Sequence, residues 1–146
     1  MRLTVYTDYA LRLLMYLAVK DDGLATIAEV ADSYGISKNH LMKVAHQLGQ
    51  AGYVATVRGR GGGLRLAKQV EAIRLSDVVR RTEPDMAVVE CLSSDNACCL
   101  GPACRLRHTL QRALAAFMAV LDDVTLADLT APGRDLRQLL GLVEAK

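Results

Sequence analysis

Apolar and polar positions alternate with the period of amphipathic helices over the first third of the chain. The pattern predicts a first helix over Tyr6–Lys20, which Asp22–Gly23 should end. A second helix should begin at the capping box of Thr26 and Glu29, in which each side chain bonds the other residue's backbone. Gly35 follows the last apolar position of this helix and, with its easy access to positive φ, is expected to terminate it.

A third helix is predicted directly after this turn. Ser37 is its expected N-cap, and Gly49 and Gly52 are expected to close it. Its inward stripe consists of Leu41, Val44 and Leu48. Two short amphipathic helices joined by a glycine turn are typical of a helix-turn-helix.

The next segment has the pattern of a β-hairpin. Two β-prone runs, Tyr53–Val57 and Leu64–Leu66, flank the glycine-rich turn Arg58–Gly63. A phosphate-binding loop is the alternative for such a glycine run, but the Lys-Ser/Thr pair that should follow is missing, and the run joins strands. A hairpin directly after a recognition helix is a wing.

The second half of the chain predicts more helices around one polar loop. A short helix is expected over Leu75–Arg81, capped by Ser76, and Val88–Cys104 should form a polar, cysteine-bearing loop. Beyond it an apolar seam with spacings of about four and three predicts a long helix. The seam consists of Leu106, Leu110, Ala113, Phe117, Val120 and Val124. Leu126–Leu142 should add an amphipathic tail.

The predicted fold is mainly α: a winged helix-turn-helix with a small β-hairpin wing and a long C-terminal dimerisation helix. The expected division is a DNA-binding domain over residues 1–82, a cysteine loop over 83–105, and the dimerisation helix with its tail over 106–146. A long helix outside a small domain must bury its seam. Pairing with a second copy is therefore expected, and packing back onto its own domain is the alternative.

Charge is unevenly distributed along the chain. No Asp or Glu occurs between Ser33 and Val70, so this window carries a formal charge of +6 and the remainder −4. Segregated positive charge suits a polyanion such as DNA. The N-terminus has no apolar signal region, and the run Ala113–Leu121 is too short to span a bilayer. A cytoplasmic protein that does not enter the membrane is expected, with reduced cysteines.

The candidate DNA-binding residues lie on the predicted recognition helix and on the wing. With the apolar stripe facing inward, the polar residues near the start of the third helix should enter the major groove of double-stranded DNA. These residues are Lys38, Asn39, His40 and Lys43. Arg58 and Arg60 at the hairpin tip are placed to contact phosphates or the minor groove.

All the cysteines lie close together, at Cys91, Cys98, Cys99 and Cys104. A cysteine cluster in a polar loop is typical of an iron–sulfur cluster or a zinc ion. Neighbouring side chains of an extended segment diverge, so Cys98 and Cys99 should not both reach one metal. Three cysteine ligands and a vacant fourth position are therefore expected.

Four segments resemble a known family, the iron–sulfur-dependent winged-helix repressors that include the nitric-oxide sensor NsrR and the cluster-biogenesis regulator IscR. The matching segments are Thr7–Arg12, Ile36–Val44, Arg58–Leu66 and Pro102–Leu106. Leu121–Asp122 and Thr125–Leu129 are similar to NsrR in particular. The resemblance covers essentially the whole chain.

The resemblance implies a set of cluster ligands. Cys91 matches the first family cysteine, and the usual spacing of the last two selects Cys98 with Cys104, while Cys99 stays open as an alternative to Cys98. Asp8 falls where NsrR uses an aspartate from the first helix of the other subunit.

The same resemblance separates NsrR from IscR. IscR has a histidine ligand three residues after its last cysteine, where this chain has Arg107, with His108 one position too late. The implied protein is a homodimeric repressor, not an enzyme. The resemblance further implies one cluster per subunit, [4Fe–4S] in preference to [2Fe–2S], whose nitrosylation by nitric oxide is expected to release operator DNA. An IscR-type regulator and a zinc-stapled DNA-binding protein are the alternatives.

Overall fold

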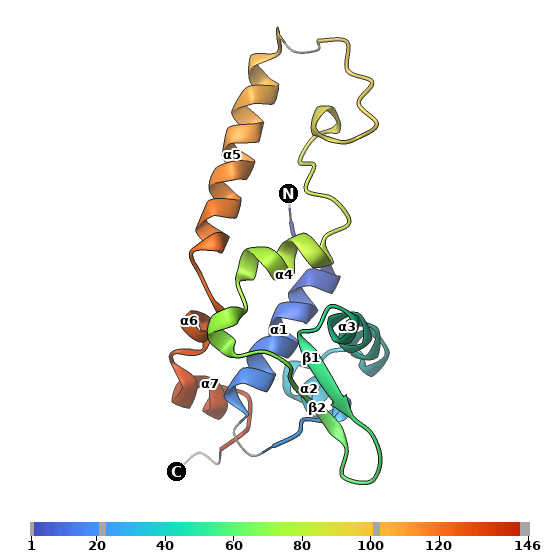
Figure 1. Ribbon diagram of the computed structural model, residues 1–146, viewed down its shortest axis with the longest axis vertical. Helices are drawn as coiled ribbons and strands as arrows, with labels where there is room; N and C mark the ends of the chain where they lie inside the picture. Colours follow the sequence, from blue (N-terminus) through green and yellow to red (C-terminus); the bar gives the residue numbers. More distant parts are fainter. Residues whose placement is uncertain (1, 21–22, 101–102, 144–146) are drawn as a thin grey trace.

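The computed structural model describes residues 2–20, 23–100 and 103–143. Figure 1 shows a helical body that carries a small hairpin, and an arm formed by one long helix and the loop that runs beside it. Three residues named by the sequence predictions lie outside the described residues: Asp22 of the helix end, Gly101 of the predicted cysteine-bearing loop, and Pro102 of that loop and of a family segment.

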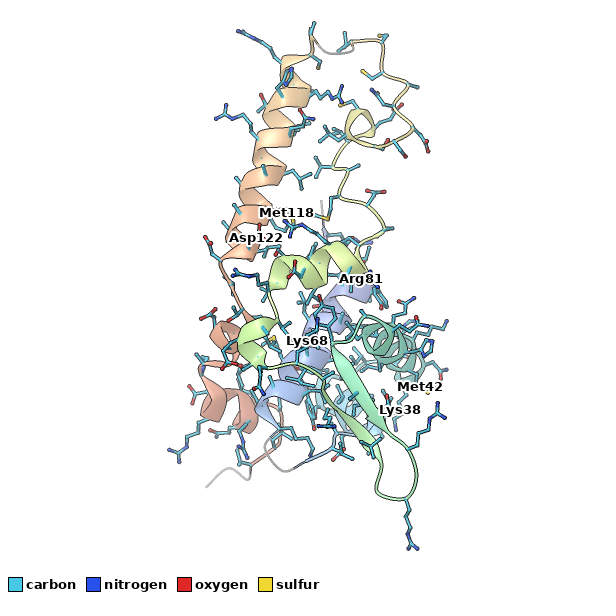
Figure 2. All side chains as sticks on the ribbon, viewed as in Figure 1. Lys38, Met42, Lys68, Arg81, Met118 and Asp122 are labelled. Atoms are coloured by element: carbon cyan, nitrogen blue, oxygen red, sulfur yellow. The ribbon has the colours of Figure 1, made fainter. Side chains whose placement is uncertain are left out.

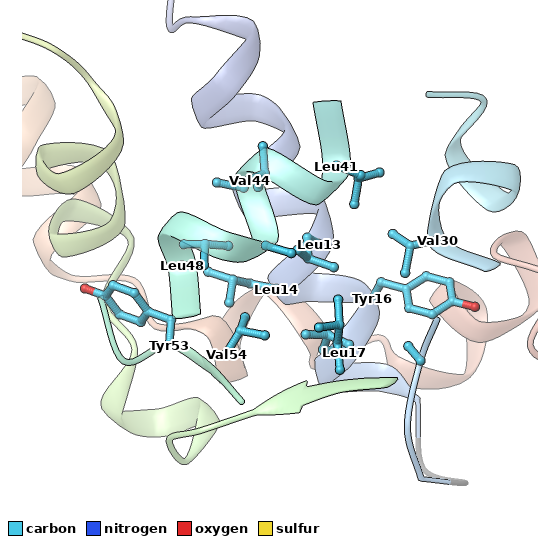
Figure 3. Close-up of a cluster of buried hydrophobic side chains, with 14 of the residues drawn as sticks. Leu13, Leu14, Tyr16, Leu17, Val30, Leu41, Val44, Leu48, Tyr53 and Val54 are labelled. Atoms are coloured by element: carbon cyan, nitrogen blue, oxygen red, sulfur yellow. The ribbon is translucent and has the colours of Figure 1, made fainter. Parts of the chain in front are cut away.

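Helix α1 (Val5–Val19) is the centre of the body. It packs against α3 (Lys38–Gln50), α4 (Leu75–Thr82), α6 (Leu126–Thr130) and the strand Gly63–Leu66. The fully buried residues that it contributes include Ala10, Leu13 and Leu14. Figure 3 shows these leucines meeting the apolar stripe of α3. Helix α1 therefore contacts the third helix, the hairpin and the C-terminal helices in one core.

The helix-turn-helix is confirmed in α2 (Ile27–Tyr34) and α3 (Lys38–Gln50). Both hydrogen bonds of the Thr26–Glu29 capping box are present, and Gly35 ends α2 in the left-handed region at φ 64°. Two details differ from expectation. Ser37 is the N-cap of α3, but its hydroxyl makes no capping hydrogen bond. Gly49 lies inside α3, which continues to Gln50.

The wing is an antiparallel hairpin of β1 (Val54–Val57) and β2 (Gly63–Leu66). Its base is fixed to the body by Ala25, whose N–H and carbonyl exchange hydrogen bonds of 2.9 and 2.7 Å with Leu64. A Cβ on Gly63 would lie only 2.8 Å from the Ala25 carbonyl oxygen, so this crossing requires glycine. The free end of the hairpin extends away from the body (Figure 1).

A 3₁₀ turn, η1 (Val70–Ala72), leads from the wing to α4 (Leu75–Thr82). The prediction that Ser76 caps α4 is wrong: Arg74 is the N-cap, and Ser76 lies inside the helix with its side chain fully buried. Arg74 has extended backbone and pairs with Thr125 in a short β-bridge, so the helix begins directly after it, at Leu75.

Helix α5 (Arg105–Asp122) forms the arm, and the loop beside it contains the 3₁₀ turn η2 (Glu90–Leu92). Among its described residues only Met118, near the body, is buried. Val124, assigned to the seam, lies beyond the end of this helix.

The tail after α5 folds as α6 (Leu126–Thr130) and α7 (Gly133–Leu139). Both helices contact α1, and Leu126 is buried in the core, where its N–H donates to the Ile73 carbonyl at 2.8 Å. The predicted mainly α fold with a small wing is therefore confirmed.

Candidate functional site

The outward face of α3 is polar with one exception. Leu41, Val44 and Leu48 are buried against α1, as the spacing predicted. Asn39 and Lys43 therefore point away from the core and are exposed. Met42 and His46 lie on the same face, one turn apart, and are also exposed. The sequence interpretation did not name these last two, although the same helical period places them there.

Lys38 and His40 lie at the two edges of this face. The Lys38 ammonium is 3.7 Å from an Asp32 carboxylate oxygen on α2. His40 lies beside Tyr9 of α1, with 6.3 Å between the ring centroids. Both side chains remain exposed. Neighbours on α2 and α1 thus orient them along the borders of the polar face.

The hairpin brings further positive charge to this end of the body. Arg58 and Arg60 are exposed at the turn, and no described carboxylate lies within ion-pair distance of either. Lys68, just after β2, has its ammonium 4.4 Å from the centre of the Tyr53 ring. Guanidinium groups without an acidic partner are free to bind phosphates.

The cysteines lie on the arm. Cys91 is in η2 and Cys104 is the N-cap of α5; both are half-buried, while Cys98 and Cys99 are exposed. All are free thiols. Local bonds shape the loop, because the Cys98 N–H donates to Asn96 Oδ1 at 2.9 Å and the Ala97 N–H to Glu90 Oε1 at 3.3 Å.

Within the described residues of one chain, no three ligating side chains converge on a point that could hold a metal. The donor set itself fits an iron–sulfur cluster, since free thiols near solvent on a loop without regular structure can close around such a group. Arg107 and His108 follow Cys104 in the first turn of α5.

Asp8 lies in the first turn of α1, and its carboxylate is about half exposed. It accepts a hydrogen bond of 3.0 Å from Arg12 Nε, and the Arg12 guanidinium lies 5.7 Å from the centre of the Tyr34 ring. Burial raises the pKa of Tyr34 to about 12, so this ring stays uncharged beside the ion pair. The cysteine loop climbs along α5 away from α1 (Figure 1), so one chain does not bring Asp8 to the cysteines.

Hydrogen bonds that the sequence did not predict join the end of α4 to the start of α1. Glu83, the first residue after α4, accepts hydrogen bonds from Thr4 N–H at 2.8 Å and from Thr4 Oγ1 at 3.0 Å. Beside it, the Thr7 and Thr82 hydroxyls bond at 2.8 Å in a buried position. These bonds tie the base of the cysteine loop to the first turn of the helix that carries Asp8. No local sequence signal marks them, because the partners are far apart along the chain.

None of the described helices is long and apolar enough to cross a bilayer.

Comparison with known proteins gives concordant results. A family model described as Rrf2, iron-dependent transcriptional regulator, matches residues 3–132. The chain is 51% identical to the HTH-type transcriptional regulator NsrR of Bacillus subtilis over 146 residues, covering 99% of this chain and all of that protein. It is 50% identical to NsrR of Shouchella clausii over 142 residues, covering 96% of this chain and 95% of that protein.

Solved structures match the fold. CymR, the global cysteine regulator of B. subtilis, superimposes with a TM-score of 0.75 at 28% identity, covering 90% of this chain and 98% of that one. IscR of T. potens matches with a TM-score of 0.73 at 22% identity, covering 94% and 92% of the two chains. At that identity, IscR supports the fold alone.

The relatives matched in sequence are named as transcriptional regulators, which agrees with the prediction that the chain is not an enzyme. The chain belongs to the Rrf2 family of iron-dependent transcriptional regulators, and it is similar to NsrR over its whole length.

Proposed function

We propose that this regulator is a homodimeric repressor that binds operator DNA in the cytoplasm and releases it when nitric oxide reaches an iron–sulfur cluster. Its DNA-binding surface combines the polar face of α3 with the wing arginines. The main support is the exposed positive charge of Arg58 and Arg60 beside that face, with which no described carboxylate pairs. Lys38, Asn39, His40 and Lys43 would contact bases and phosphates in the major groove.

The ligands proposed for the cluster are Cys91, Cys98 and Cys104 of one subunit and Asp8 of the other. The free, accessible thiols support the first part, and the half-exposed Asp8 carboxylate, which faces outward from α1, supports the second. When bound, the cluster supplies iron that reacts with nitric oxide. A [4Fe–4S] cluster is favoured, one per subunit.

Dimerisation through α5 is supported by the apolar surface that this helix leaves uncovered. Leu106 is 64% and Val120 65% exposed. Between them Leu110, Ala113 and Phe117 line an apolar hollow together with Val88 of the cysteine loop. Contiguous exposed apolar surface of this kind is typical of a protein–protein contact. A second copy of α5 would cover it and place the cysteine loop of each subunit near the body of the other.

The link between cluster and DNA runs through α1. Asp8 belongs to this helix, and α1 packs directly against α3. A cluster held by the cysteines of the partner subunit and bound to the Asp8 carboxylate would therefore fix α3 relative to that subunit. Arg12 is the alternative partner of the same carboxylate, at 3.0 Å. When Arg12 takes the carboxylate, the two recognition helices lose the spacing that successive half-sites about one helical turn apart require.

Anaerobically purified protein tests the proposal. It should be coloured and contain iron and sulfide, and it should select a two-fold symmetric sequence from a pool of random DNA duplexes. A nitric-oxide donor should then abolish binding to that duplex, whereas the same donor already exhausted of nitric oxide should not. A colourless protein that contains zinc, or DNA binding that nitric oxide leaves unchanged, would contradict the proposal.

A further inference from the structure

The outward face of α3 contains one large apolar side chain. Met42 is 51% exposed, whereas its neighbours on that face, Asn39, Lys43 and His46, are all polar. Figure 2 shows Met42 at the outer edge of α3, pointing away from the body. A methionine at this position is not needed for the core.

The core stripe of the same helix accounts for its internal packing. Leu41 and Val44 are almost fully buried on the opposite side, and Met42 is absent from the apolar side chains that pack against the core. The α5 face proposed for dimerisation belongs to a different part of the molecule (Figure 1). The described part of the chain leaves about half of the Met42 surface accessible to a bound partner. Met42 therefore provides an apolar contact on the otherwise polar outward face of α3, and an apolar group on the bound DNA would complement it.

We propose that Met42 is a specificity-determining residue that packs against the C5 methyl group of a thymine in the major groove. This inference rests on the proposed DNA-binding function. The thymine methyl is the one apolar group among the base edges of that groove, and it distinguishes T·A from every other pair. A thioether side chain is flexible and polarisable, so it can follow this methyl group closely. Asn39 and Lys43 flank it with the hydrogen-bonding groups that would read neighbouring bases.

Replacing thymine by deoxyuridine tests this contact, because uracil pairs like thymine and lacks only the methyl group. The duplex selected from the random pool by the parent protein is resynthesised with one thymine at a time changed to deoxyuridine. At one thymine of each half-site, the parent protein should lose affinity about fourfold, the effect of burying one methyl group. Met42→Ala should bind the thymine duplex more weakly than the parent protein does. It should bind the deoxyuridine duplex as well as it binds the thymine duplex.

Two matched Met42 variants and one Lys43 variant separate this contact from a general loss of affinity. Met42→Leu keeps an apolar end and should retain the preference for thymine, whereas Met42→Gln, of similar length and polar, should lose it. Lys43→Ala should weaken binding to both duplexes while keeping the fourfold ratio of the affinities for the thymine and deoxyuridine duplexes. Thermal unfolding should be the same for the parent and for all the Met42 variants, because the side chain is exposed.

Opposite results would overturn the inference in distinguishable ways. If the parent protein selects a sequence but tolerates deoxyuridine at every thymine, Met42 does not read a methyl group. The same conclusion follows if Met42→Gln keeps the full preference for thymine. If no sequence is selected from the pool at all, the proposed DNA-binding function itself fails.

Discussion

Cys98 and Cys99 are adjacent and both exposed, so burial does not indicate which of them is the second cluster ligand. We predict that Cys91→Ala, Cys98→Ala and Cys104→Ala each abolish stable cluster binding, and that Cys99→Ala retains it, because thiolate ligands hold the iron. Visible absorbance with iron and sulfide analysis of anaerobic protein measures this. An intact cluster in Cys98→Ala with loss in Cys99→Ala would reverse the assignment of the second ligand.

Glu29 gives a pH dependence to the helix-turn-helix. The Thr26 backbone N–H holds the pKa of this carboxyl below its usual value of 4.5, with a contribution from Lys20. A lowered folded-state pKa means stability that is present above the unfolded pKa and is lost as pH falls through the folded value. We therefore predict that Glu29→Gln, which keeps the hydrogen bond and removes the charge, lowers the free energy of unfolding by about 0.3–1 kcal/mol at neutral pH.

The difference between Glu29→Gln and the parent should shrink as the pH falls below the usual carboxyl pKa of 4.5 and through the lowered pKa of the folded state. Urea unfolding across a pH series measures it. A constant difference from neutral to acidic pH would show that the charge of Glu29 is not the cause.

At the residue scale, periodicity predicted which α3 side chains face outward, but not what lies beside them. Asn39 and Lys43 follow from the helical period alone. The neighbours of Lys38 and His40 belong to α2 and α1, and only the packing of three helices brings them together. Ser76 shows the reverse error: serine is a frequent N-cap, yet Arg74 is the N-cap and Ser76 is buried inside the helix.

At the level of elements, the wing is a short hairpin whose tip arginines have no described acidic partner. We predict that Arg58→Ala or Arg60→Ala weakens binding to the selected duplex. Each change should also reduce the slope of log affinity against log salt by about one, because one phosphate contact and its counterion release are lost. Lys43→Ala should also weaken binding.

Fluorescence anisotropy at several salt concentrations measures these slopes. If all three variants bind the duplex like the parent protein, the assignments of the wing and of the recognition helix are both wrong.

The bounds of most elements were predictable because caps, glycines and apolar periods are local signals. The connections between elements were not. Ala25 pairs with the wing strand, and Glu83 bonds the start of α1, through contacts between residues distant in sequence. The first contact fixes the wing to the body, and the second fixes the base of the cysteine loop to α1.

At the scale of the whole molecule, α1 is shared by the core, the recognition helix and the proposed cluster site. Asp8 has an ordinary role as well, since a carboxylate in the first turn that pairs with Arg12 stabilises the helix by about 0.3–1 kcal/mol. That role alone predicts that Asp8→Ala lowers stability slightly and leaves the cluster unchanged. The ligand role predicts altered cluster absorbance, together with operator binding that depends less on the state of the cluster.

A mixed dimer of Asp8→Ala and Cys91→Ala subunits tests the coupling most directly. The Asp8→Ala homodimer should show the altered absorbance and the Cys91→Ala homodimer should hold no stable cluster. In the mixed dimer, the intact cysteines of the Asp8→Ala subunit should receive Asp8 from the Cys91→Ala subunit, so the single remaining cluster should have the absorbance of the parent protein. A mixed dimer whose cluster has the absorbance of the Asp8→Ala homodimer would contradict ligation across the subunits.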